Sequence, residues 1–415
     1  MMSNRKKYSA LFFLVTYTSS SWSMVCDNRY YPWYTRPFHR TVDEQSRFGT
    51  GLFFTSAGNA IGDEAKQKKT IPELWGVYDQ KKMSDALVEL GMTSPLLAQW
   101  QKGIEKIPWT VNGSVKSQGM YLYGEYDFYK GLSIGGSVFV GQFLANQSFI
   151  IPSDTKKLLG LTARQELQLD AERREMFEML GFSETQWSVT GPSDIELHLR
   201  WGTVQEYVLR CRTIDIGTSF YVYVPTAPFR DVNNPAAVPV GGNHLVGLAW
   251  GFDGAFELKE DFTVGLQFSI IKRLAKIQQT RMPIQNEPYI FGAIVGPAKI
   301  DPDPTIYFNP YLTLGTLKGG WNTSVGYIVA FNGGSVWTDM RQDQTVPTTL
   351  NGIYEKSAWC AEYISLLLSY DFDSVHQRHA SHPVFTLMWD IPLHFMGSHD
   401  FARSQMVTVG MEVHF

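Results

Sequence analysis

Hydrophobic and polar residues alternate along many short segments of this chain, with the period of two that a half-buried β-strand requires. From Asp194 to Trp201 every odd-numbered position is apolar and every even-numbered position is charged. The chain ends in the same way, because apolar positions from Val407 to Phe415 alternate with polar or small ones. Segments of about ten residues with this alternation are typical of strands that cross a membrane as part of a barrel.

Read back from Phe415, the alternation predicts about twelve strands, and an even number is expected of single-chain bacterial barrels. The predicted fold class is therefore all-β: a transmembrane, antiparallel, up-and-down β-barrel with helical insertions in its outer loops. The predicted strands lie near 47–57, 117–129, 132–145, 193–204, 209–224, 243–256, 261–274, 304–316, 319–332, 358–372, 383–396 and 404–415.

The connections between these strands alternate between short and long. Short turns such as Lys130-Gly131 fall at one end of the predicted barrel, which is the periplasmic end if the N-terminus lies there. Short periplasmic turns and long outer loops are the usual asymmetry of such barrels. The linker 373–382 is an exception, because it is long for a periplasmic turn. The predicted outer loops are 58–116, 146–192, 225–242, 275–303 and 333–357.

Two of the outer loops carry residues that begin helices. In the second of them, Thr162 and Gln165 form a capping-box pattern ahead of a long charged segment that ends at Gly181. These patterns predict helices within the loops. The predicted N-caps are Ser84 and Ser94 in the first loop, and Thr162 and Ser183, the latter paired with Gln186, in the second.

The N-terminus has the pattern of a secretory signal peptide over residues 1–23. Arg5-Lys6-Lys7 precedes an apolar run, and Ser21-Trp22-Ser23 fits a small-x-small cleavage site. Cys26 follows this site, but Ser23 and Val25 do not fit the pattern that precedes a lipidated cysteine. Residues 24–46 are then either a periplasmic N-terminal segment or a plug of the lumen, and residues 47–415 are the barrel.

Composition agrees with a membrane barrel. Charged residues make up 18% of the chain, aromatic residues 14%, and no internal run of 18 apolar residues exists. The net charge of −4 and the lack of a long basic cluster argue against a nucleic-acid partner. No specific nucleotide-binding, zinc-protease or other catalytic motif is present. We therefore expect no enzyme activity, no cofactor and no metal.

The same alternation predicts which ionisable side chains face the lumen. Eight carboxylates lie on this face against two arginines, an excess that favours cations in a water-filled pore. A satisfied polar network that fills a narrow barrel is the alternative. His198, Arg200 and Asp215 come together across one hairpin, where we expect a salt bridge. The candidate pore-lining residues are Glu125, Asp127, Asp194, Glu196, His198, Arg200, Asp215, Asp253, Asp390 and Glu412, and the same face includes Arg273, His394 and His414.

The middle of the chain resembles a known family. Ser193-Asp194-Ile195-Glu196-Leu197, Thr213-Ile214-Asp215-Ile216-Gly217 and Val224-Pro225-Thr226-Ala227 are similar to a strand pair of the meta-pathway phenol-degradation barrels. Ser193 and Ala227 replace glycines of that family, and the resemblance covers about 193–270. It implies an outer-membrane channel related to those that admit hydrophobic compounds, and it implies no catalytic residues.

The amphipathic last strand, closing on Phe415, resembles the signal by which the outer-membrane assembly machinery recognises its clients. We therefore expect a channel or facilitated pore for small solutes in the outer membrane of a Gram-negative bacterium. Its expected partners are outer-membrane lipid, the assembly machinery and a small-molecule solute. A surface-exposed structural or recognition barrel, with a plugged lumen and helical outer loops, is the alternative.

Overall fold

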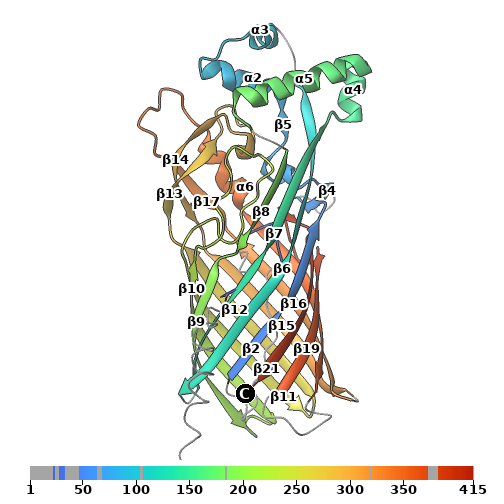
Figure 1. The fold of residues 1–415 in the computed structure, drawn as a ribbon, viewed down its shortest axis with the longest axis vertical. Coiled ribbons are helices and arrows are strands. Elements are labelled where there is room, and N and C mark those ends of the chain that lie inside the picture. The colour runs from blue at the N-terminus through green and yellow to red at the C-terminus, as the bar shows by residue number, and fades with distance from the viewer. Residues whose placement is uncertain are drawn as a thin grey trace, which may run out of the picture.

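The computed structural model describes residues 22–23, 28–32, 46–62, 68–102, 106–129, 131–182, 185–317, 319–372 and 382–414. Within these ranges twelve antiparallel strands close into a barrel, because β2 pairs with β6 on one side and with β21 on the other (Figure 1). The barrel strands are β2 (Ser46–Ala57), β6 (Pro108–Tyr129), β7 (Leu132–Ile150), β9 (Ile195–Glu206), β10 (Thr213–Val224), β11 (Gly247–Lys259), β12 (Phe262–Arg273), β15 (Thr305–Leu317), β16 (Trp321–Asn332), β18 (Trp359–Asp371), β19 (His382–Leu393) and β21 (Gln405–His414).

The predicted fold class and strand order are confirmed, but several strand ends differ from the prediction. Strands β6 and β7 begin and end farther out, at Pro108 and Ile150, because they remain paired with each other above the rest of the barrel. Strand β10 begins only at Thr213. The preceding residues form a turn in which Tyr207, Leu209 and Arg210 have positive φ angles.

The two faces of the barrel wall differ as the alternation requires. On β9, Leu197, Leu199 and Trp201 are 46%, 42% and 68% exposed, whereas Arg200 between them is 4% exposed. The apolar outer face continues round the barrel through exposed side chains such as Trp250 on β11 and Trp389 on β19. An unbroken apolar outer face around a closed sheet is what contact with lipid requires.

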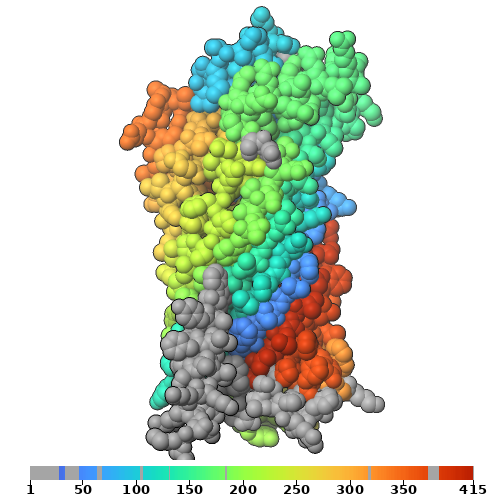
Figure 2. Space-filling model, viewed as in Figure 1, coloured from blue at the N-terminus to red at the C-terminus, as the bar shows by residue number. Residues whose placement is uncertain are grey.

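An outer region stands above the barrel, at the end opposite the C-terminus (Figure 1). Its helices α4 and α5 project sideways over the barrel wall (Figure 2). Among the described residues, no helix is both long and apolar enough to cross a membrane. The helical elements are η1 (Pro72–Trp75), α2 (Gln80–Glu89), α3 (Pro95–Gln101), α4 (Ser153–Leu159), α5 (Ala163–Met179), η2 (Tyr289–Phe291), η3 (Leu350–Gly352) and α6 (Ile353–Ser357).

Short strands complete the outer region. Strands β13, β14 and β17 form a three-stranded antiparallel sheet from two segments that the sequence pattern assigned to loops. These short strands are β3 (Ala60–Ile61), β4 (Lys68–Lys69), β5 (Tyr78–Asp79), β8 (Gln186–Pro192), β13 (Lys276–Met282), β14 (Ile294–Pro302), β17 (Ser335–Asp339) and β20 (Phe401–Ala402). The two-residue strand β1 (Trp22–Ser23) pairs with β6 and β7.

The helix predictions are partly confirmed. Thr162 and Gln165 form the capping box of α5, and Ser94 caps α3. Ser84 is not an N-cap, because α2 begins earlier, after Asp79, and Ser84 is buried inside the helix. Gln186 begins strand β8 instead of lying in the first turn of a helix, because β7 extends far enough to pair with it.

The outer region has its own apolar core. Tyr78, Phe149, Phe177 and Phe291 pack edge to face or tilted, with ring centroids 5.0–5.9 Å apart. These rings come from β5, β7, α5 and η2, so one cluster joins segments far apart in the sequence. The outer loops therefore form a packed subdomain that stands on the barrel.

Candidate functional site: the barrel lumen

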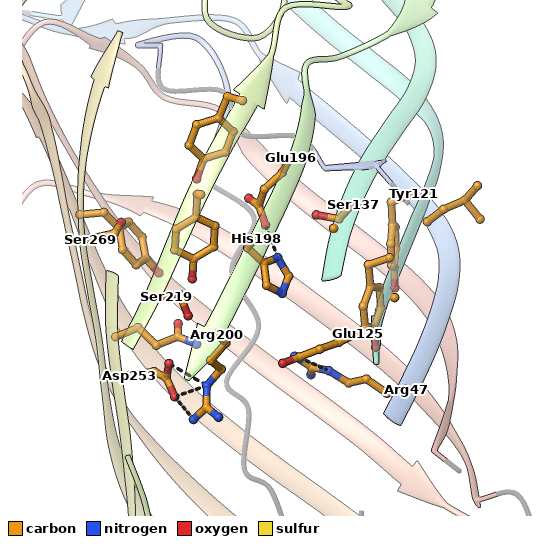
Figure 3. A pocket seen from close by; sticks show the side chains of 18 of the residues that line it. Arg47, Tyr121, Glu125, Ser137, Glu196, His198, Arg200, Ser219, Asp253 and Ser269 are labelled. Carbon is orange, nitrogen blue, oxygen red and sulfur yellow. Dashed lines mark hydrogen bonds and ion pairs between the residues drawn. The ribbon is translucent and has the colours of Figure 1, made fainter. Parts of the chain in front are cut away.

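A cavity of about 200 Å³ lies within the barrel. Side chains from β2, β6, β7, β9 to β12 and β15 surround it, and Figure 3 shows charged groups pointing into it from opposite walls. Tyrosine rings make up much of the remaining lining. The cavity residues with polar or aromatic side chains are Arg47, Tyr121, Tyr123, Glu125, Ser137, Phe139, Glu196, His198, Arg200, Ser219, Tyr221, Tyr223, Phe252, Asp253, Gln267, Phe268, Ser269 and Tyr307.

Two pairs of tyrosines on the inner wall explain how so many rings fit in a narrow barrel. Tyr121 and Tyr123 stack with their centroids 6.3 Å apart on β6, and Tyr221 and Tyr223 do so at 6.3 Å on β10. The first pair lies over glycines of neighbouring strands. A Cβ atom on Gly49 would stand 2.1 Å from Cε1 of Tyr123, so the missing side chain makes room for the ring.

Arg200 is the centre of one ion-pair cluster at the cavity. Its Nη2 lies 2.9 Å from Oδ1 of Asp215 and 2.5 Å from Oδ2 of Asp253. The predicted salt bridge between Arg200 and Asp215 is confirmed. Arg200 is opposite Ser219 in the strand register and reaches along the wall to the carboxylate. The expectation that His198 joins this pair is wrong, because His198 is opposite Tyr221 and lies beside Glu196. A charge-assisted cluster of this kind holds the guanidinium in one orientation.

Arg47 is the centre of a second cluster on the opposite wall. It lies 2.8 Å from Glu125 and 3.7 Å from Glu412, and His414 lies 3.1 Å from the same Glu412. The sequence analysis did not single out Arg47. The signal was present, since Arg47 falls on the same face of β2 as Phe53, which is fully buried, and opposite Phe48 and Leu52, which are exposed.

A third ion pair lies where the lumen meets the outer loops. Arg273 Nη1 contacts Oδ2 of Asp194 at 2.8 Å, and the backbone N–H of Gly242 donates to the same oxygen at 2.8 Å. The loop that contains Gly242 thereby folds inward. Its buried residues Ala236, Val238 and Val240 belong to the same cluster as the inner-wall rings of β6 and β7.

The remaining predicted lumen residues lie in different surroundings. Glu196 and His198 face the cavity, with Oε1 of Glu196 3.3 Å from Nδ1 of His198. Asp127 is partly buried below the cavity, and Asp390 is completely buried on β19, away from it. Five of the ten candidates therefore line the cavity: Glu125, Glu196, His198, Arg200 and Asp253.

His394 does not face the lumen, because β19 ends before it and its side chain is exposed. Phe415 lies outside the described residues.

A short segment near the N-terminus lies inside the upper lumen. Arg29, Tyr30 and Tyr31 are 3%, 4% and 2% exposed. The guanidinium of Arg29 stacks 4.2 Å from the centre of the Trp75 ring and donates to the carbonyl oxygens of Leu74 and Lys356. The carbonyl of Arg29 accepts a hydrogen bond from the N–H of Ala402 at 2.8 Å. Residues 28–32 are thus bound to the outer end of the barrel, which the sequence pattern did not reveal.

Buried charges in the outer region hold its loops together. Arg281 donates to the carbonyl oxygens of Val232, Gly292 and Leu180 at 2.6–3.0 Å, and burial lowers the pKa of its guanidinium to about 10. Burial raises the pKa of the Tyr289 hydroxyl to about 12, although Arg230 opposes the shift. Both groups fix neighbouring loops in place and lie outside the lumen cavity.

Solved structures with a similar chain path identify this architecture. An outer-membrane channel from Pseudomonas putida F1 is similar over 92% of this chain and 100% of its own, with a TM-score of 0.51 and 10% sequence identity. The chain has the fold of an outer-membrane channel. The sequence matches no protein-family model and no curated protein.

Two further solved structures are less similar. The toluene transporter TbuX from Ralstonia pickettii covers 90% of each chain at 9% identity, with a TM-score of 0.32. The NanC porin covers 71% of this chain and 92% of its own at 6% identity, also with a TM-score of 0.32. TM-scores of this size do not support a conclusion about the fold.

Within the described ranges, no group of three or more histidine, cysteine or acidic side chains could hold a metal ion. Cys211 and Cys360 are both free thiols. The lumen offers tyrosine rings, paired carboxylates and arginines, which together can bind and orient a small solute.

Proposed function

We propose that this protein is an outer-membrane channel that passes small solutes, including hydrophobic ones with a single ring, through its lumen. The observation that carries the proposal is the cavity inside a closed barrel whose outer face is apolar. The similarity of the fold to the Pseudomonas putida outer-membrane channel supports it. The protein is then a transporter without enzyme activity, located in the outer membrane of a Gram-negative bacterium and contacting its lipid.

The candidate pore-lining residues divide into three groups under this proposal. Glu196, His198 and Asp253 contact the passing solute, while Asp194 and Asp215 act by holding arginines in place. Glu125 and Glu412 do the same for Arg47 on the opposite wall. Asp127 and Asp390 complete the inner wall without touching the cavity.

In this proposal, two segments in the upper lumen act as the gate. Residues 28–32 act as a plug, and the inward loop around Gly242 narrows the same level of the barrel. The channel conducts when one or both of these segments move away from the wall. The N-terminal 23 residues are a leader that is removed on export, so β1 is absent from the mature channel.

Planar bilayers test the proposal directly. Purified protein should give discrete conductance steps, and proteoliposomes should take up a small aromatic solute such as toluene faster than protein-free vesicles. Removing residues 28–32 should increase the open time. The proposal would be contradicted if the bilayers showed no conductance steps and the vesicles took up the solute no faster than protein-free vesicles.

The alternative is a recognition barrel with a permanently plugged lumen. The packed helices of the outer region favour it, because α4 and α5 project where a partner outside the cell could reach them (Figures 1 and 2). A silent protein whose α5 surface binds a partner on the cell exterior would support this alternative.

A further inference from the structure

The chemistry of the cavity points to a particular class of solute. We propose that the lumen cavity binds organic cations that carry one ring, such as an arylalkyl ammonium ion. This inference deepens the proposed function, because it names the class of solute that the channel would select. Three independent features of the cavity carry it: its size, its aromatic lining and its net charge.

The size of the cavity limits the ligand to one ring. Its volume is about 200 Å³. A buried apolar cavity of about 150 Å³ is enough to hold benzene, so this one holds a single ring with a short substituent. A fused ring system with a side chain would require the wall to move.

The aromatic lining favours a positive charge. Ring faces attract cations within about 6 Å of their centres. The rings of this lumen already bind cations of the protein itself, because the guanidinium of Arg47 lies 5.6 Å from the centre of Tyr123 and that of Arg273 lies 5.1 Å from Tyr223. Tyr121, Tyr221 and Tyr307 add further ring surface around the cavity.

The net charge of the cavity excludes anions. Its lining includes the three carboxylates of Glu125, Glu196 and Asp253 and two arginines, Arg47 and Arg200. Each arginine also contacts one carboxylate beyond the lining, Glu412 for Arg47 and Asp215 for Arg200. These five acids and two arginines give a formal net charge of −3 around the cavity, histidine not being counted. Walls of low dielectric strengthen this negative potential.

The positions of the acidic side chains determine how the ligand is oriented in the cavity. The side chain of Asp253 is 28% exposed and that of Glu196 is 13% exposed, and Figure 3 shows Glu196 turned toward the interior beside His198. The ammonium group would lie against Glu196, and the ring would lie between the tyrosines of β6 and β10. A neutral ring in the same position would lack this charge contact, so we expect it to pass through the cavity with weaker binding than the cation.

Three ligands of similar shape test the inference: benzylammonium, benzyl alcohol and benzoate, which carry one positive, no and one negative charge. Calorimetric titration of the purified full-length protein in detergent should show benzylammonium binding at least about tenfold more tightly than benzyl alcohol, the size of one favourable charge contact. Benzoate should bind more weakly than either. Equal affinity for the three ligands, or preference for benzoate, would overturn the inference.

Matched variants locate the site. Glu196→Gln should weaken benzylammonium binding about tenfold and leave benzyl alcohol unchanged, because only the charge is removed. Glu260→Gln, an acid in an exposed turn, should change neither affinity. If Glu196→Gln fails to assemble, as judged by loss of its heat-modifiable form, Tyr221→Leu replaces it and should also weaken benzylammonium binding. An unchanged affinity in the assembled variant would overturn the proposed site.

The same preparation separates this inference from the channel itself. Conductance steps with no preference for benzylammonium would overturn the cation site and leave the channel intact. Benzylammonium binding in a protein that gives no steps and no uptake would support the site and contradict the channel.

Discussion

Arg273 on β12 and Asp194, just before β9, form a buried ion pair at 2.8 Å, although the two strands are separated in the barrel by β10 and β11. The side chains are 4% and 0% exposed. The pair therefore spans part of the lumen, and the N–H of Gly242 binds to the same carboxylate oxygen. It anchors the inward loop to the barrel.

Gly242→Ala should widen the channel. A Cβ atom at this position would stand 2.1 Å from Cζ of Arg273, so Arg273 or the loop must shift and the contact between them is disturbed. We expect a larger single-channel conductance with the barrel still assembled. Gly58→Ala is the control, because a Cβ there meets no atom within 4 Å. Equal conductance in the two variants would show that the loop does not narrow the pore.

Arg200→Gln should destabilise the barrel by about 3–5 kcal/mol, because it leaves the buried carboxylate of Asp215 without its partner. Adding Asp215→Asn should recover part of this loss, since the remaining charge is then removed. Urea-induced unfolding in lipid vesicles measures both changes. Arg212→Gln, which breaks an exposed ion pair, serves as the control and should have little effect.

Asp390→Asn should leave the stability of the barrel unchanged or raise it, whereas Arg200→Gln should lower it. Asp390 is completely buried opposite Ser365, and neither of its carboxylate oxygens accepts a hydrogen bond from the part of the chain that the structure describes. Removing a charge from such a position relieves a desolvation cost, so the free energy of unfolding should stay the same or rise by about 1–3 kcal/mol. A clear decrease would mean that the carboxylate has a stabilising partner in the folded barrel.

The conducting channel should prefer cations. Neutralising Asp194, Glu196 and Asp215 together removes three negative charges and releases Arg273 and Arg200 from their partners. The reversal potential in a salt gradient should then move toward that of the anion. Arg200→Gln in the same background would separate the effect of the released guanidinium. A reversal potential that does not move in a conducting triple variant would remove these residues from the ion path.

Deleting Phe415 should reduce assembly in the outer membrane. The residue lies beyond the described part of β21, the strand that closes the barrel against β2. A truncated protein should accumulate before insertion, and less of it should show the heat-modifiable folded form on a gel. Phe415→Tyr, which keeps the terminal ring, is the matched control. Normal assembly of the truncated chain would contradict a role for Phe415 as an assembly signal.

The barrel could be predicted from the sequence because each strand has one apolar and one polar face. The strand Ile195–Glu206 shows this pattern clearly, and so does the last strand, since each contacts lipid on one side only. The Arg200–Asp215 pair could also be predicted, because the two residues belong to one hairpin. Asp253 joins them only through the register between β10 and β11, which alternation alone does not specify.

Other features depend on contacts that leave no periodic pattern. Arg29 donates a hydrogen bond to the carbonyl oxygen of Lys356, which is 327 positions away in the sequence. The inward loop around Gly242 contains no helix or strand. The sheet of β13, β14 and β17 was missed because β13 and β17 are short and β17 pairs with β14 from a different loop. Arg47 was missed for a different reason, since it stands at the start of its strand, where the alternation is weakest to read.

The lengths of β6 and β7 determine where the mouth of the channel opens. Strand β6 has 22 residues and β21 has 10. About ten residues are enough to cross the hydrocarbon layer at the usual tilt of about 45°, so the remainder of β6 rises by up to roughly 30 Å beyond it. The hairpin of β6 and β7 therefore extends beyond the membrane. In the proposed channel, this extension places the outer end of the hairpin within the layer of lipopolysaccharide sugars, so that solutes would reach the lumen through that layer.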